Sequence, residues 1–287
     1  MKRGLVLPQG SARQHGVALI AVLWIVAALG ILVTGMAQSH RDEIRTVATA
    51  RGTVQASAIG GGATQLVLQK IALRPELFDR LSRFDVEYAG LNVVVEMLPL
   101  NGLVDINKAP ESLLTALFAV AGGLPAEAAA GLARNLAASR LPGRGRTTGP
   151  RYEAVEDLLQ LPGMDFALYA RLSSIVTTDG AGSGRVNPLA APSGVLAVLA
   201  NGDAARVANI AAARDAGKTG VDTTTLATEF VDNTVSTRFR LQARVPLADG
   251  RWLLSTRTVN VVKDSARGLP WRVLHAEDRV EPLAATN

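Results

Sequence analysis

The side chains that most often carry out chemistry are few in this sequence of 287 residues, and they stand far apart. Cysteine is absent, and the three histidines are His15, His40 and His275. Acidic residues are scattered, and no glycine-rich phosphate-binding loop follows a stretch with strand character. Because nucleophile–base pairs and metal sites need such groups at fixed spacings, we expect a protein that is not an enzyme and that requires no cofactor.

The peptide bond between Gly16 and Val17 has surroundings that suggest another kind of chemistry, proteolytic processing. A leader with three basic residues and no acidic residue precedes this bond, and twenty uncharged residues, 17–36, follow it. A helix of that length measures about 30 Å, which matches the hydrocarbon core of a bilayer. Because positive charge before an apolar span favours a cytoplasmic N-terminus, the pattern predicts one membrane-spanning helix with the rest of the chain on the other side.

Three interpretations of this N-terminal segment are compatible with its composition. It is a plain signal anchor, a signal peptide cut at Gly35-Met36-Ala37, or a prepilin-type segment cut after Gly16 with its helix retained. Signal peptides usually have an apolar region of about 7 to 15 residues, which is shorter than this run. The length and charge of the leader, the glycine at the junction and the continuation of the helix favour the prepilin type.

The basic excess of the chain is concentrated in the leader. The isoelectric point is near 10, and the formal net charge is +5. Without the three basic residues of the leader, the remainder carries about +2. We therefore interpret the excess as a signal for membrane topology and expect no nucleic-acid partner.

After the apolar run, the pattern predicts that the helix continues and then gives way to strands. Apolar residues recur at three- and four-residue steps up to Ala72, and Pro75 ends the helix. Gly60-Gly61-Gly62 lies within it and is expected to be a kink or a close-contact site. Alternating apolar residues then predict two strands, at 84–88 and 91–97, joined by a tight turn.

The C-terminal part of the chain shows the same alternation. Apolar residues alternate with polar ones from Phe239 to Val245, and Asp249-Gly250 is a favourable hairpin turn. The return strand runs from about Arg251 to Val262, with one face buried and the other cationic and solvated. We expect the tail, residues 264–287, to be flexible and loosely attached.

A helical region between these strands, 105–215, contains two related motifs. In the first, Asn107 is followed by Pro110 and a helix start; in the second, Asn187 is followed by Pro192 and a helix start. Proline suits the first turn of a helix, and an asparagine side chain can bond to an adjacent turn. These four residues are therefore predicted to be structural, and we assign no catalytic role to the asparagines.

Between the two motifs, Pro162-Gly163 is a predicted turn between two helices. The arrangement is similar to half of a helix-hairpin-helix, a unit that in other proteins offers backbone amides to DNA phosphates. Asp165 places a negative charge where a second glycine would be needed, so we favour a packing role for the turn. The loop before it, 141–150, is rich in glycine and proline and is expected to be mobile.

The N-terminal junction and the order of these elements resemble the general secretion pathway protein K family, the large minor pseudopilins of type II secretion. The resemblance is carried by residues 16–20, 104–114 and 155–164, by the motif at Asn187 and by the closing hairpin. Most pilin-like subunits have glutamate at the fifth mature position, where this chain has Ala21, and the protein K family commonly lacks it. In the wider class that carboxylate neutralises the α-amino group of a neighbouring subunit. A terminal subunit would meet no such amine, which makes Ala21 a determinant of position in the filament.

The resemblance implies an α+β fold, in which a transmembrane and spine helix packs on a small antiparallel pilin-like sheet. A large all-α domain, SAM-like and helix-hairpin-helix-like, would be inserted into that sheet. The expected segments are a prepilin leader (1–16), the transmembrane and spine helix (17–73), the first part of the β-domain (74–104), the inserted α-domain (105–215), the returning β-hairpin (216–263) and the tail (264–287).

The resemblance also implies a role at the tip of the type II secretion pseudopilus. Prepilin peptidase would process and methylate the chain at Val17, and the minor pseudopilins I and J would join it to initiate and cap the filament that exports folded proteins across the outer membrane. The chain would be a single-pass inner-membrane protein with a periplasmic domain, with further contacts to the secretin or to secreted cargo. Some members of the family bind calcium, for which we place no ligands. The alternatives are a minor pilin of a type IV or DNA-uptake filament and a membrane-anchored periplasmic binding module.

Overall fold

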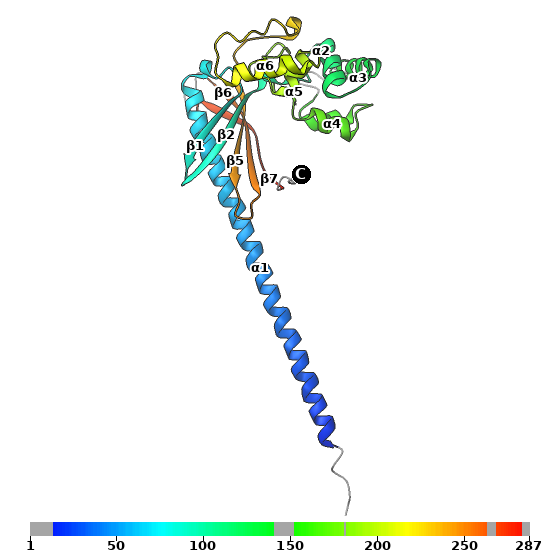
Figure 1. Cartoon of the computed structure of the whole chain (residues 1–287), viewed down its shortest axis with the longest axis vertical. Helices are drawn as coiled ribbons and strands as arrows, with labels where there is room; N and C mark the ends of the chain where they lie inside the picture. The colour runs from blue at the N-terminus through cyan, green and yellow to red at the C-terminus, as the bar shows by residue number, and fades with distance from the viewer. Residues whose placement is uncertain (1–13, 141–151, 181, 263–267, 283–287) are drawn as a thin grey trace, which may run out of the picture. The chain divides into compact units, whose positions relative to one another are not determined.

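The computed structural model describes residues 14–140, 152–180, 182–262 and 268–282; of residues 14–18 and 31–46 it describes the backbone only. The α-helices are α1 (Gln14–Leu73), α2 (Glu111–Ala116), α3 (Ala126–Ser139), α4 (Phe166–Leu172), α5 (Ser193–Leu199) and α6 (Ala204–Asp215) (Figure 1). The strands are β1 (Ser82–Tyr88), β2 (Leu91–Pro99), β3 (Val104–Asp105), β4 (Val176–Thr177), β5 (Arg238–Pro246), β6 (Trp252–Val261) and β7 (Trp271–Glu281). Short 3-10 helices cover Pro75–Leu77, Leu100–Gly102, Val155–Gln160 and Thr228–Phe230, and Leu117–Ala121 is a π-helical turn.

The chain divides into two compact units, Met1–Gln55 and Ala56–Asn287, and α1 contributes to both. In the first unit, every residue of 19–30 is exposed. Among the residues that the structure describes, no helix is both long enough and apolar enough to span a membrane. The predicted span, 17–36, includes residues 17, 18 and 31–36, whose side chains lie outside the described residues, as does the leader up to residue 13.

In the second unit, a five-stranded antiparallel sheet has the strand order β1-β2-β5-β6-β7. β1 and β2 form the first predicted hairpin, with Val86 opposite Val93, and β5 and β6 form the second, with Ala243 opposite Ser255. Both predicted hairpins are therefore confirmed. Pairing of β2 with β5 joins the two hairpins into one sheet, although the helical region separates them in the sequence.

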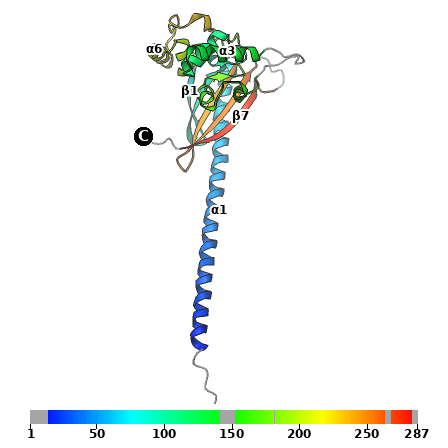
Figure 2. The same cartoon turned by 90° about the vertical axis from the view of Figure 1, so that its right-hand side faces the viewer.

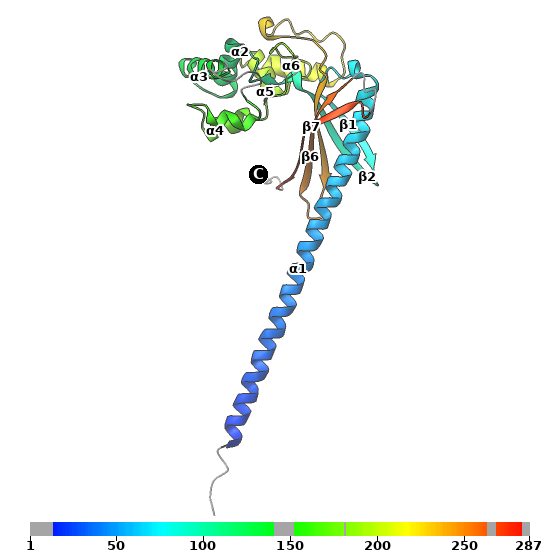
Figure 3. The same cartoon turned by 180° about the vertical axis from the view of Figure 1, so that it is seen from behind.

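The C-terminal part of α1 packs on one face of this sheet (Figure 3). The buried residues of the helix recur at three- and four-residue steps, which is the pattern of an amphipathic helix: Ala56, Ile59, Ala63, Val67, Leu68 and Ile71. They meet buried residues of the strands, among them Val93, Val95, Met97, Phe239 and Leu241. The helix ends at Leu73, just before Pro75, as predicted.

The three consecutive glycines of α1 mark a close approach between the helix and the sheet. A Cβ atom on Gly60 would lie 2.8 Å from Cβ of Ser255, and one on Gly62 would overlap the ring of Tyr88. On Gly61 it would have no heavy atom of the described chain within 4 Å. Because α1 continues unbroken through this stretch, the glycines form the predicted close contact and not a kink.

The segment after the second hairpin differs from the prediction. Residues Trp271–Glu281 form the edge strand β7, which pairs antiparallel with β6. Asp278 of β7 accepts a hydrogen bond from Ser255 at 2.8 Å and forms an ion pair with Arg257 at 2.7 Å. The prediction of a loosely attached tail is therefore wrong for these residues, because the edge of β6 that does not pair with β5 forms backbone hydrogen bonds with them. Residues 263–267 and 283–287 lie outside the described residues.

Helices α2 to α6 gather at the end of the sheet where α1 finishes (Figures 1 and 2). Their buried side chains form a second core, which includes Leu113, Phe118, Leu136, Leu172 and Leu196. A short parallel pair of strands, β3 and β4, lies in this region and places Val104 beside Val176. The α+β fold and the helical region between the two hairpins agree with the expectation.

The predicted helix before the Pro-Gly turn is confirmed as a 3-10 helix, Val155–Gln160. One detail of the helical region differs from the predictions. Leu226 and Phe230, which were assigned to the returning hairpin, pack in the core of the helical region, because Val231 pairs there with Val186. The predicted mobile loop, 141–150, lies outside the described residues.

Candidate functional site

The predicted processing site lies at the start of α1. Gly16 and Val17 belong to its first turn, and their side chains lie outside the described residues. Ala21 follows on the same helix and is exposed. The structure therefore places these three residues on one continuous helix.

The described part of α1 around Ala21 exposes large apolar side chains on all sides. Eight of them are more than half exposed: Leu19, Ile20, Val22, Leu23, Trp24, Ile25, Val26 and Leu29. We call this stretch, residues 19–30, the apolar helix surface. It covers more than three helical turns, so its side chains point in every direction around the helix axis. A helix that is apolar all round is normally buried in a larger protein, an assembly or a membrane.

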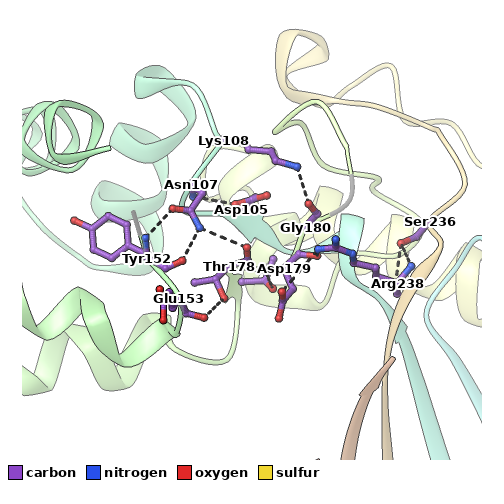
Figure 4. Close-up of polar contacts among 11 residues, drawn as sticks. Asp105, Asn107, Lys108, Tyr152, Glu153, Thr178, Asp179, Gly180, Ser236 and Arg238 are labelled. Atoms are coloured by element: carbon purple, nitrogen blue, oxygen red, sulfur yellow. Dashed lines mark hydrogen bonds and ion pairs between the residues drawn. The ribbon is translucent and has the colours of Figure 1, made fainter. Parts of the chain in front are cut away.

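A second candidate site is a network of polar groups where the helical region meets the sheet (Figure 4). We call this network the polar joint and define it by Asp105, Asn107, Lys108, Gly180 and Arg238. Asp105 ends β3, and the turn after it carries Asn107 and Lys108. Because β3 and β4 are parallel, the segment after β4 leaves at the same edge and brings Gly180 to this turn.

Asn107 links two segments that are distant in the sequence. Its Oδ1 accepts a hydrogen bond from the N–H of Tyr152 at 3.1 Å, and its Nδ2 donates to the carbonyl oxygens of Tyr152 at 2.9 Å and Thr178 at 3.4 Å. The predicted bond to its own adjacent turn is therefore wrong. That turn is bonded by Asp105 instead, whose Oδ1 accepts the N–H of Asn107 at 2.9 Å.

Asn187 makes the predicted local bond and a distant one as well. Its Oδ1 accepts the N–H of Leu189 at 3.0 Å, and its Nδ2 donates to the carbonyl oxygen of Asp79 at 3.0 Å. Its own N–H donates to the carbonyl oxygen of Asn101 at 2.8 Å. Asn187 thus holds the helical region to the segment between α1 and β1, and it lies outside the polar joint.

Pro110 and Pro192 each precede a helix by one residue. Both have an extended backbone and stand at the N-cap positions of α2 and α5. Their carbonyl oxygens accept the N–H groups of Leu114 and Leu196, at 3.1 and 3.0 Å. These prolines were predicted in the first helical turn and lie one position before it, so the prediction is wrong by one residue. At an N-cap position the backbone is extended, and the carbonyl oxygen already accepts the first hydrogen bond of the helix.

Asp105 is a buried acid with a perturbed pKa. Its side chain is 4% exposed, and burial raises the pKa of its carboxyl from 3.8 to about 6. The hydrogen bond from Asn107 and the positive charges of Lys108 and Arg140 lower the pKa by less than burial raises it. The polar joint thus offers one group that can take up or release a proton near neutral pH.

The polar joint continues through two residues to the sheet. Lys108 donates through Nζ to the carbonyl oxygen of Gly180 at 2.9 Å. Arg238, the first residue of β5, donates through Nη1 to the carbonyl oxygen of Asp179 at 2.8 Å. Ser236 donates through Oγ to the carbonyl oxygen of Arg238 at 2.8 Å, which fixes the start of the strand. The segment after β4 therefore bonds the helical region to the sheet.

Pro162-Gly163 lies outside the polar joint. Gly163 has a φ of +94°, and Asp165 caps α4 by accepting the N–H of Leu168 at 2.7 Å, which accounts for an acid at this position. A pocket of about 300 Å³ beside this turn is lined by Ser139, Tyr152, Glu153, Asp157, Gln160, Leu161 and Pro162. Within the described ranges, no three histidine, aspartate or glutamate side chains gather in a way that could hold a metal ion.

Sequence reasoning missed Asp105, Lys108, Arg140 and Arg238. One signal for Asp105 was available, because an aspartate two residues before Asn107 is typical of an Asx turn. No local signal indicates that Asp105 is buried, because the residues that lie against it are distant in the sequence: Thr177 pairs with it, and Gly180 packs on its carboxyl.

Comparisons with known proteins found similarity among solved structures. No protein-family model matches the chain, and no curated protein matches it. A solved structure is similar. It is a chain of the GspK–GspI–GspJ complex of the type 2 secretion system from enterotoxigenic Escherichia coli. The sequence identity is 16% and the TM-score is 0.46, over 82% of this chain and 99% of that chain.

Proposed function

We propose that this protein is a minor pseudopilin of a type II secretion system that works at the tip of the pseudopilus. The observation that carries the proposal is the difference between the two parts of α1. From Ala56 onwards the helix packs on a five-stranded sheet, whereas residues 19–30 form the apolar helix surface. Such a helix suits a subunit that is first anchored in a membrane and then joins a filament built of helices.

Burial of the apolar helix surface supplies free energy both for anchoring the subunit in a membrane and for joining it to a filament. Burying one large apolar side chain contributes about 1.5–3 kcal/mol, so eight of them contribute roughly 12–24 kcal/mol. A bilayer covers these side chains before assembly, and the helices of neighbouring subunits cover them afterwards. Because both surroundings are apolar, the subunit moves from one to the other at little cost.

The N-terminal sequence suits processing by a prepilin peptidase. Cleavage after Gly16 removes the basic leader and makes Val17 the first residue, methylated as in the class. Ala21 is then the fifth residue, and it has no carboxylate to neutralise the amine of a neighbouring subunit. An amine without a counter-charge in an apolar filament is costly, so a subunit without this carboxylate belongs at the end of the filament.

The helical region supports the same position. Its helices lie at the end of the sheet where α1 finishes, so they would occupy the space that a further subunit needs. The proposed partners are minor pseudopilins I and J, with the secretin or secreted cargo as contacts of the tip. The protein would cross the inner membrane once and carry a periplasmic domain. We propose no enzymatic activity, no nucleic-acid partner and no required cofactor, and we place no calcium ligands.

Co-purification tests the proposed assembly. We expect a tag on minor pseudopilin I or J of the same bacterium to recover the full chain from detergent-solubilised membranes. Replacing Leu23 with glutamate puts a charge into the apolar helix surface and is expected to lower the recovery by about tenfold or more, because an unpaired charge is costly to bury. Val235→Glu is the matched control, since Val235 is an exposed apolar residue of the second unit, and it should leave the recovery unchanged.

Other outcomes would redirect the assignment. Failure of both partners to recover the unchanged chain contradicts the assembly. Binding of DNA at moderate salt would instead indicate a pilin of a DNA-uptake filament. Normal secretion of exoproteins after deletion of the gene would indicate a membrane-anchored periplasmic binding module.

A further inference from the structure

Asp105, the buried acid of the polar joint, accepts a hydrogen bond on one of its two carboxyl oxygens and not on the other. The Oδ1 atom of Asp105 accepts the N–H of Asn107 at 2.9 Å, whereas Oδ2 is buried and has no hydrogen-bond partner among the described residues. An ionised carboxylate accepts hydrogen bonds on both oxygens. These surroundings therefore favour the neutral acid over the anion.

Two cations face this carboxyl, and their hydrogen bonds go to backbone carbonyls. Lys108 donates through Nζ to Gly180, and Arg140 donates through Nη1 to Ala109 at 2.7 Å. Both positive charges act on Asp105. The Nε and Nη2 atoms of Arg140 are buried, and in the part of the chain that the structure describes they bond to no other group. The joint and the adjacent Arg140 therefore offer donors that an anion at Asp105 would attract.

Gly180 packs directly over the carboxyl. A Cβ atom on Gly180 would lie 2.5 Å from Oδ2 of Asp105, so the backbone of the loop rests on this side chain. The preceding residue, Asp179, faces Arg238, whose Nη1 lies 2.8 Å from its carbonyl oxygen and 3.8 Å from its carboxylate. Arg240 of β5 also interacts electrostatically with Asp179, and Glu277 of β7 interacts with Arg240 in turn. A movement of Gly180 is therefore transmitted to the sheet through one residue, Asp179.

We propose that the polar joint is a pH-controlled coupling between the helical region and the sheet, closed when Asp105 is neutral and loosened when Asp105 is ionised. Ionisation attracts Lys108 and Arg140 to Oδ2. Lys108 then exchanges its bond to the carbonyl of Gly180 for a bond to the carboxylate. Release of Gly180 weakens the adjoining contact between Asp179 and Arg238. This coupling is independent of the function proposed above.

The direction of the pH effect follows from the burial of Asp105. The pKa is about 6 in the folded chain and 3.8 as the ordinary value. The carboxyl of Asp105 therefore has a higher pKa in the closed joint than in the open one. Below the ordinary pKa, the neutral acid stabilises the closed joint fully. This stabilisation is lost as the pH rises through the raised pKa. With these two values, the ratio of open to closed joint increases about tenfold between pH 5 and pH 7.

Amide hydrogen exchange of residues 177–180 in the full chain tests the coupling. After correction for the intrinsic rate, exchange is expected to be about tenfold faster at pH 7 than at pH 5. Asp105→Asn keeps an oxygen that can accept the N–H of Asn107 but carries no charge, so it should give slow exchange at both pH values. Asp165→Asn removes an acid outside the joint and should retain the tenfold difference.

A second measurement applies if the Asp105→Asn chain does not fold. In the unchanged protein, the NMR shift of the Asp105 carboxyl carbon is expected to titrate near pH 6, together with the amide of Gly180. Equal corrected exchange at the two pH values, or a carboxyl midpoint near 3.8, would overturn the proposal. An unaltered pH dependence in a folded Asp105→Asn chain would overturn it as well.

Discussion

Replacing Asn187 with alanine is expected to lower the free energy of unfolding of the full chain by about 3 kcal/mol. The Asn187 side chain is 1% exposed, and it bonds to the N–H of Leu189 and to the carbonyl oxygen of Asp79. Alanine removes the partner of both backbone groups, and each buried polar group left unpaired costs about 1–3 kcal/mol. The substitution thus weakens the connection between the helical region and the segment that follows α1.

Chemical unfolding followed by tryptophan fluorescence measures this difference, since Trp252 and Trp271 lie on strands of the sheet. Asn92→Ala is the control, because Asn92 is exposed on β2 and its loss should change the free energy of unfolding by less than about 0.5 kcal/mol. A loss below about 1 kcal/mol for Asn187→Ala, or equal losses for both variants, would contradict the role assigned to Asn187.

Two adjacent glycines of α1 are expected to respond to substitution in opposite directions. Gly60→Val should lower the free energy of unfolding by about 2–3 kcal/mol, because its side chain would be forced against the fully buried Ser255. Gly61→Ala should raise it by about 1 kcal/mol, because alanine favours a helix over glycine and the new methyl group meets open space. The same unfolding experiment measures both changes.

These two variants serve as controls for each other, since they differ by one position on the same helix. A difference of about 3 kcal/mol or more between them supports the close approach of helix and sheet at Gly60. Equal effects on the free energy of unfolding would show that Gly60 is not needed for packing against Ser255.

The elements that depend on local pattern could be predicted from the sequence. The first hairpin is an example, because the turn residues Ala89 and Gly90 both have positive φ angles, 53° and 77°, as a two-residue hairpin turn requires. Alternation of apolar residues then sets the pairing, with Phe84 opposite Val95. The end of α1 before Pro75 follows from local chemistry in the same way.

Strand β7 could not be predicted because its pattern is interrupted. The pairing register shifts between Thr258 and Val259, so the partner passes from His275 to Val273 and the strict alternation of buried and exposed residues is lost. An edge strand also buries less of its surface than a central one, and most side chains of β7 are exposed.

The polar joint could not be predicted because it depends on residues that are far apart in the sequence. The asparagine motifs look alike locally, and the predicted local bond holds for Asn187 and fails for Asn107. The difference arises because the carboxyl group of Asp105 already accepts the backbone N–H of Asn107 in this turn. The side chain of Asn107 is therefore available to bind Tyr152. The processing residues, Gly16 and Val17, were found from the sequence, and their role stays a prediction.

The mature N-terminus tests most directly the central claim that this chain is a pseudopilin. The full chain is expressed with and without an active prepilin peptidase, and mass spectrometry identifies its N-terminal peptide. We predict a chain that begins at methylated Val17 only when the peptidase is active, and a Gly16→Val chain that keeps its leader. An intact Met1 in the presence of the active peptidase, or a chain that begins at Gln38, would contradict the claim.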